Sequence, residues 1–277
     1  MIRRSRIPTL SPQDVELAEA AADCVSETHH RLAAFLRTGL TLADVDKEVA
    51  QILADVDCES CFLNYRVPRT PPFPSHACLS LNECVVHGTH DYFTRPIEPG
   101  DLLKIDIGVT HRGFIGDAAW TYSFGEPEQR VRDLMESGKR SLREGVEMLA
   151  PGKPLLEWAK AVQRVVEHED RFHLVRGLGG HGYGRALHEP PFVSNTVPTH
   201  PGEWPDAFVK CEPGMLVAVE PMLAIGTNAT RQELRSWPIY SADGSMTVHY
   251  EADVLVTEDG PRNLTARMWE LPDVIDA

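Results

Sequence analysis

Two acidic residues interrupt apolar strand patterns at matching points, and their type and placement suggest chemistry. Asp106 lies in Leu-Leu-Lys-Ile-Asp-Ile, and Glu220 lies in Leu-Val-Ala-Val-Glu-Pro. Asp and Glu are depleted in strands and are almost never fully buried without a partner. Either acid alone could lie on a solvated face of a sheet. This explanation is weaker when an acid occurs at the matching point of both strand patterns.

Asp117 adds a third acid that the strand pattern places close to Asp106. If the strands before and after residue 111 form a hairpin centred between His111 and Arg112, Asp106 lies directly opposite Asp117. A bulge at Gly113 would shift this register. At ~4 Å and an effective dielectric constant near 20, two like charges repel by about 4 kcal/mol. Such a pair persists when a cation lies between the acids or when one of them stays protonated.

Glu251 repeats this arrangement in the strand Thr-Val-His-Tyr-Glu-Ala-Asp-Val. The preceding Asp243-Gly244 is a hairpin turn signal. This turn predicts that Glu251 lies opposite Ser236 or Trp237.

A glycine-dense segment over 177–190 presents His181 and His188. Its G-x-G-x-x-G pattern matches the dinucleotide-binding fingerprint, but five prolines between 190 and 205 exclude the helix that this motif requires. His188 and the following Glu begin a zinc-protease motif, whose second histidine is replaced by Phe192. We therefore predict a loop that lets the backbone approach a site closely while presenting two histidines.

Together these residues form an oxygen-rich ligand set with a single imidazole. Two divalent cations would balance the four carboxylate charges, and such a set suits Mn²⁺, Fe²⁺, Co²⁺ or Zn²⁺. Two metals about 3.5–4 Å apart activate a water and polarise a carbonyl or phosphoryl group. The predicted ligands are Asp106, Asp117, His181, Glu220 and Glu251.

Helices and strands that position these residues follow from capping and periodicity. Ser11 and Thr41 start two helices, the first ending near Arg37, and the prolines between 56 and 75 exclude a central strand there. Further helices are predicted over 127–149 and 155–168. Strands are predicted over 77–81, 102–109, 114–124, 215–223 and 246–257.

An internal repeat organises these elements. The segment 98–106 aligns with 212–220 at an offset of 114, and Gly39 aligns with Gly152 at an offset of 113. We predict two αα-β halves, about 11–125 and 126–268, that pack as one domain around a shared cleft. Residues 1–10 and 269–277 are expected to be terminal tails.

Composition narrows the class of protein. The 277 residues carry 27 Lys and Arg against 41 Asp and Glu, a net charge of −14, which argues against nucleic acid as a partner. No apolar run reaches the ~18 residues of a membrane span. The basic segment 1–6 lacks a following apolar region, so no secretory signal is expected. We expect a cytoplasmic monomer.

The six cysteines are consistent with reduced thiols rather than a disulfide framework. Cys58 and Cys61 have the spacing of half a zinc site, but neither a second such pair nor a close pair of histidines completes it. We expect two semi-buried thiols.

With these motifs the chain resembles the type I methionine aminopeptidases of the pita-bread metallopeptidase family, from about residue 10 to 265. The resemblance implies an α+β pita-bread fold. The motifs that carry it are Leu81-Asn82-Glu83-x-x-x-His87-Gly88, Ile105-Asp106-Ile107, Gly116-Asp117, Gly180-His181-Gly182-Tyr183-Gly184-x-x-x-His188-Glu189-x-Pro191, Val219-Glu220-Pro221-Met222 and Tyr250-Glu251.

By this resemblance the chain is a hydrolase that removes N-terminal methionine from peptides and from nascent chains near the ribosome. Asp106 and Asp117 bind metal, and Asp117 and Glu251 bridge two divalent ions. Glu220 and His181 hold the second ion, and Glu220 also carries a proton for the attacking water. His87 and His188 bind the scissile amide and stabilise the tetrahedral intermediate.

The resemblance also implies an apolar pocket for the methionine side chain. Cys61, Tyr65, Cys78 and Trp237 match the family's pocket residues. Two positions depart from it, because Phe73 replaces the usual Tyr and Leu187 replaces the usual Phe. The loop over 64–74 is also longer and richer in proline than the family pattern.

Three alternatives stay open. A proline-directed aminopeptidase or dipeptidase of the same fold generally has an additional N-terminal domain, whereas ten residues precede the first predicted helix. A metal-free binding protein of this fold would have lost ligands, and none is lost here. A dinuclear phosphoesterase fits the acids but not the two motif histidines and the apolar pocket.

Overall fold

Two helices begin at the predicted capping residues. Ser11 and Thr41 each accept a hydrogen bond from the backbone N–H three residues on, and the Asp there accepts one in return from the cap backbone. Helix α1 covers Pro12–Phe35 and α2 covers Leu42–Asp55. The computed structural model describes residues 9–276, so the basic segment 1–6 and most of the predicted tail 1–10 lie outside the described residues.

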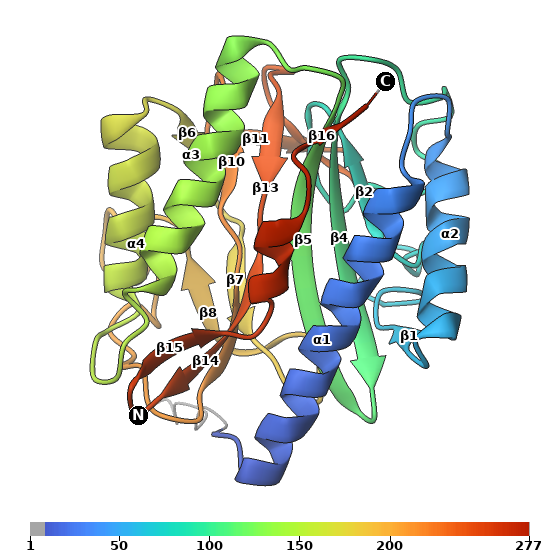
Figure 1. The fold of residues 1–277 in the computed structure, drawn as a ribbon. Helices are drawn as coiled ribbons and strands as arrows, with labels where there is room; N and C mark the ends of the chain where they lie inside the picture. The colour runs from blue at the N-terminus through green and yellow to red at the C-terminus, as the bar shows by residue number, and fades with distance from the viewer. Residues whose placement is uncertain (1–8, 277) are drawn as a thin grey trace.

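The first sheet is built on a long antiparallel hairpin (Figure 1). It has the order β1-β4-β5-β16, and β2 also pairs with β4. As predicted, the region 56–75 contributes only a two-residue strand to it. Its strands are β1 (Glu59–Ser60), β2 (Cys78–Leu81), β4 (Leu102–His111), β5 (Phe114–Phe124) and β16 (Val274–Ile275).

The second half repeats the order of two helices followed by a sheet. Helix α3 covers Gln129–Val146, and α4 covers Leu156–Gln163 and continues into a π-helical turn, Arg164–Glu169. The predicted helix over 155–168 therefore changes type near its end. The sheet has the order β15-β14-β9-β7-β8. Its strands are β7 (Gly179–Gly182), β8 (Glu189–Ser194), β9 (Leu216–Val219), β14 (Ala252–Thr257) and β15 (Gly260–Asn263).

Two smaller sheets complete the fold, with the orders β13-β10-β6 and β11-β12-β3. Their strands are β3 (Cys84–Val86), β6 (His173–Leu174), β10 (Met222–Ala224), β11 (Thr230–Gln232), β12 (Ile239–Ser241) and β13 (Thr247–His249). The mixture of helix and sheet agrees with the predicted α+β class. No helix within residues 9–276 is long and apolar enough to cross a membrane.

The two halves repeat a backbone hydrogen bond. Gly39 donates to Ile97 O at 2.8 Å, and Gly152 donates to Cys211 O at 2.8 Å. Both glycines have a φ near +80 to +90°, a conformation that glycine adopts without strain. Gly39 and Gly152 are 113 residues apart, and Ile97 and Cys211 are 114 residues apart, which are the offsets of the sequence alignment. We infer from this that the chain contains an internal repeat.

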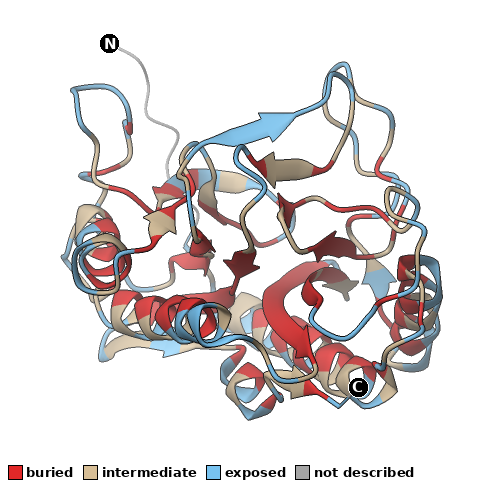
Figure 2. Cartoon of the chain, turned by 90° about the horizontal axis from the view of Figure 1, so that it is seen from above, coloured by how far each residue is buried: buried red, intermediate tan, exposed pale blue. Residues whose placement is uncertain are grey.

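The strands of the two halves meet at the centre of the molecule. The Glu251 N–H donates to Ala119 O at 3.0 Å, and the Asp117 N–H donates to Asp253 Oδ2 at 2.9 Å. The helices lie on one side of these strands, and buried residues concentrate between the two layers (Figure 2). The acidic side chains lie on the opposite side of the strands.

The predicted register of the hairpin is wrong by two residues. Arg112 and Gly113 form the two-residue turn, and both have positive φ, as the turns that suit hairpins require. Asp106 therefore pairs with Ala119, and Asp117 pairs with Gly108. The two acids are diagonal neighbours on one face rather than directly opposed.

The chain after residue 268 is not a free tail. β16 pairs in parallel with β5, and Leu271 and Ile275 are buried. Lys139 of α3 also donates to Asp273 at 2.6 Å. The sequence did not reveal this segment because Pro272 divides its apolar residues into runs too short to produce a strand or helix pattern. The 3₁₀ helix η2 (Ala266–Glu270) leads into it.

Close packing of α1 on β5 makes a prediction about stability. A Cβ added at Gly116 would lie 2.4 Å from Ala21 O, a backbone atom of α1 that cannot move aside alone. Gly116→Ala should lower the free energy of unfolding by about 1–3 kcal/mol, measured by urea denaturation. Gly184→Ala is the control, because its methyl group would meet nothing closer than 3.9 Å. Equal stability of both variants would contradict this packing.

Candidate metal centre

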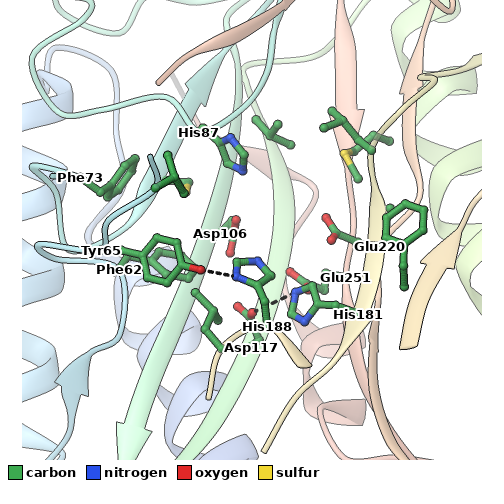
Figure 3. A pocket seen from close by; sticks show the side chains of 18 of the residues that line it. Phe62, Tyr65, Phe73, His87, Asp106, Asp117, His181, His188, Glu220 and Glu251 are labelled. Carbon is green, nitrogen blue, oxygen red and sulfur yellow. Dashed lines mark hydrogen bonds and ion pairs between the residues drawn. The ribbon is translucent and has the colours of Figure 1, made fainter. Parts of the chain in front are cut away.

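The four predicted acids come together on the strand face that lies away from the helices (Figure 3). Asp106 and Asp117 project from β4 and β5. Glu220 directly follows β9, and Glu251 lies between β13 and β14. The predicted ligands of the two halves thus share one site.

Glu220 and Glu251 face each other across a break in strand pairing. Val219 pairs with Ala252 on one side of the break, and Met222 pairs with His249 on the other. The same register places the two glutamates opposite each other. The predicted pairing of Glu251 with Ser236 or Trp237 is wrong, because β13 pairs with β10 rather than with the chain just before the Asp243-Gly244 turn.

His181 is on β7, within the segment predicted as a loop. Its Nδ1 lies 3.2 Å from Gly182 O, and its Nε2 lies 3.9 Å from Asp117 Oδ2. Burial lowers the pKa of His181 to about 3, so the ring is neutral and its Nε2 can offer a lone pair. The glycines permit close approach of strands, since a Cβ at Gly180 would lie 2.1 Å from Ala218 O.

The donor atoms fall into two overlapping groups. Ligand atoms of Asp117, His181 and Glu251 lie within 4.8 Å of one another. Glu220, His249 and Glu251 form a second such group. Glu251 belongs to both, which is the position that a bridging ligand would occupy.

The electrostatics of these acids fit bound cations. Burial raises the pKa of Glu220 to about 8 and that of Asp106 to about 7. Burial and then neighbouring acids raise the pKa values of Asp117 and Glu251 well above their usual range. Among the described residues, Asp106 Oδ1 and Asp117 Oδ1 have no hydrogen-bond partner. Because buried carboxylates are stable as anions only when they are paired, these oxygens are suited to divalent ions.

His249 is a site residue that the sequence analysis missed. It is buried, and its Nε2 lies 3.0 Å from Glu220 Oε2. The available signal was its place two residues before Glu251, which puts both side chains on one face of an extended chain. Asp253, whose carboxylate accepts from the Asp117 backbone, was missed in the same way.

His87 and His188 stand beside the acids without joining either donor group. His188 Nδ1 lies 2.8 Å from the Tyr65 hydroxyl, and its ring centre lies 4.4 Å from that of His181. Burial lowers the pKa of His188, and it lowers that of His87 to about 4. Both rings are therefore neutral at pH 7 and can donate or accept hydrogen bonds.

An apolar pocket of about 650 Å³ opens onto the acids. It is lined by five of the six predicted pocket residues, namely Tyr65, Phe73, Cys78, Leu187 and Trp237. Contrary to the prediction, Cys61 is not among the lining residues. It lies against Gly108, where an added Cβ would meet its Sγ at 2.4 Å. Lining residues that the sequence analysis missed are Phe62, Val67, Val86, Leu178, Phe192 and Met222.

The proline-rich loop that forms one wall is fixed to the second half of the chain. Phe73 donates to Tyr65 O at 2.9 Å, which closes the loop on itself. Trp237 Nε1 donates to Pro71 O at 2.8 Å. The rings of Phe73 and Trp237 meet edge to face at 5.1 Å. The wall is therefore a defined surface despite its irregular backbone.

Comparison with known proteins gives a consistent family assignment. The model of metallopeptidase family M24 matches residues 16–258. The methionine aminopeptidase of Aquifex aeolicus is 32% identical over 94% of this chain and 98% of its own length. That of Mycobacterium tuberculosis is 32% identical over 95% of this chain and 96% of its own length.

Solved structures share the pita-bread architecture. Methionine aminopeptidase from Thermotoga maritima superposes with a TM-score of 0.85 at 29% identity, covering 94% of this chain and 99% of that one. An Xaa-Pro dipeptidase from Bacillus anthracis shares the fold alone, with a TM-score of 0.72 at 19% identity, and the chain covers 64% of it. A family match over most of the chain, together with these relatives, shows that the chain belongs to metallopeptidase family M24.

Proposed function

We propose that this chain removes N-terminal methionine from peptides and nascent proteins by hydrolysing the first peptide bond. The observation that carries the proposal is the buried cluster of acids and His181 at the end of one apolar pocket. Full-length similarity to methionine aminopeptidases supports the same activity.

Two divalent ions, of Co, Mn, Fe or Zn, fit this ligand set. By the family resemblance, Asp106, Asp117 and Glu251 would hold one, and His181 and Glu220 would hold the other together with Asp117 and Glu251. The grouping of Asp117, His181 and Glu251 within 4.8 Å supports this proposal. When bound, such ions lower the pKa of a water molecule and polarise the scissile carbonyl. They also balance carboxylate charges that burial otherwise disfavours.

The side chains around these acids supply the remaining functions. Glu220 would accept a proton from the attacking water and pass it to the leaving amine, and its Oε2 lies 3.0 Å from His249 Nε2. His188 and His87 would hydrogen-bond the scissile amide, and their lowered pKa values, which keep both rings neutral, support this role. The Tyr65 hydroxyl fixes the orientation of the His188 ring.

The pocket chemistry suits methionine. Its walls are apolar and aromatic, and the flexible thioether of methionine fills irregular apolar cavities well. The free amine at the end of the peptide would lie near the acids. A bulky second residue would meet the histidines, so small second residues are favoured.

Removing a proposed bridging acid should remove metal and activity together. In Asp117→Asn we expect a loss of bound metal and a ~10–100-fold or greater loss of peptide hydrolysis, because by the family resemblance this residue would contact both proposed ions. Metal content by mass spectrometry and the hydrolysis rate test this. Asp259→Asn, an exposed acid, is the control. Full activity with stoichiometric metal in Asp117→Asn would overturn the site assignment.

His188 should matter for turnover but not for metal binding. His188→Ala is expected to lower kcat by ~10²-fold while bound metal stays the same, because the ring donates to the substrate rather than to the ions. Tyr65→Phe should have a smaller effect, since it removes only the partner that orients the ring. Metal loss in His188→Ala would make this histidine a ligand.

First-residue selectivity tests the substrate. We expect the highest kcat/KM with Met-Ala-Ser in a peptide series varied at its first residue, and activity should stop on chelation. Leu187→Phe should change discrimination among Met, Leu and norleucine by ~1–3 kcal/mol, because it adds a ring to the pocket wall. Preference for Ala-Pro peptides over Met-Ala-Ser would overturn the methionine assignment in favour of a proline-directed enzyme.

A further inference from the structure

A second cluster of metal-ligating side chains lies outside the candidate metal centre. Cys24 on α1, Cys58 just before β1 and His111 at the end of β4 place their ligand atoms within 4.8 Å of one another. The apolar pocket is lined by other residues. The proposed peptidase function makes no use of these three side chains.

Strand pairing holds two of the three ligands opposite each other. Glu59 pairs with Thr110, and Ser60 pairs with Val109. One position further in this register, Cys58 is opposite His111. Strand β1 meets the end of β4 at the lower right of Figure 1. Opposed residues have Cβ atoms about 4.5–5.5 Å apart, so their donor atoms can share one ion.

The separations fit a tetrahedral ion. With Zn–S near 2.3 Å and Zn–N near 2.0–2.1 Å, a tetrahedral site sets sulfur and nitrogen about 3.6 Å apart. Cys58 Sγ lies 3.5 Å from His111 Nδ1. Since Cys24 Sγ lies within 4.8 Å of both, movement of its side chain by about 1 Å completes the ligand triangle.

The chemistry of the donors selects the ion. Thiolates and imidazole favour zinc over magnesium or calcium. Thiols bind zinc as thiolates, so the ion displaces their protons when it binds. His111 Nδ1 lies 3.2 Å from Asp57 O and would exchange that hydrogen bond for the ion. Cys24 and His111 are partly exposed, which gives water access as a fourth ligand.

We propose that Cys24, Cys58 and His111 form a zinc site, with water as the fourth ligand, that fastens α1 and β1 to the end of β4. Cys58, one of the three proposed ligands, lies three residues before Cys61. The Cys61 N–H donates to Gly108 O at 3.0 Å. The zinc site therefore anchors the start of the segment that continues into the pocket wall.

Zinc content of purified, zinc-loaded protein tests this proposal. We expect wild type and Cys211→Ser, a buried thiol elsewhere, to hold one more zinc per chain than Cys58→Ser and His111→Ala. Cys24→Ser gives a second thiol variant at a half-exposed position in case Cys58→Ser does not fold. Cobalt substitution should produce a thiolate-to-metal charge-transfer absorption in wild type that these ligand variants lose.

The same absorption separates this site from the proposed peptidase centre. The charge-transfer absorption should persist in Asp117→Asn, whether or not that variant retains peptide hydrolysis. Equal zinc content in wild type and all ligand variants would overturn the proposal. A disulfide between Cys24 and Cys58 in freshly purified protein, found by thiol counting and mass spectrometry, would also overturn it.

Discussion

Four carboxylates brought together by neighbouring strands set the main constraint on this molecule. Asp117 and Glu251 are both almost fully buried, and like charges this close destabilise one another unless cations or protons intervene. The ring of His181 beside these acids is neutral, and the Asp117 backbone N–H donates a hydrogen bond to the carboxylate of Asp253. The strand pairing also breaks where Glu220 and Glu251 face each other. The peptidase chemistry depends on this arrangement.

Local rules predicted much of the fold. Both capping boxes and the range of β5 agree with the structure, because each depends on residues close in sequence. The acids were visible as polar residues in apolar strands. The hairpin register was wrong by two residues because turn type depends on the φ angles of Arg112 and Gly113, and the sequence allowed two centres.

Long-range partners could not be predicted in this way. The partner of Glu251 is set by β10 pairing with β13, which no turn signal indicates. The residues around His249 in the sequence are those of an ordinary strand, and only the fold brings His249 next to Glu220. Cys58 likewise matched Cys61 by spacing, whereas the fold places it with Cys24 and His111. Each of these pairings is made by packing between segments rather than by local pattern.

The seam between the halves has a consequence for the order of folding. Asp117 and Asp253 are in contact although 136 residues separate them, and Glu251 bonds to Ala119 across the same seam. Contacts of such high sequence separation form slowly, because loop-closure entropy opposes them first. A chain still emerging from synthesis therefore cannot assemble the acid cluster from its first half alone. A chain that has not yet been made in full therefore lacks the acids that the second half contributes to the site.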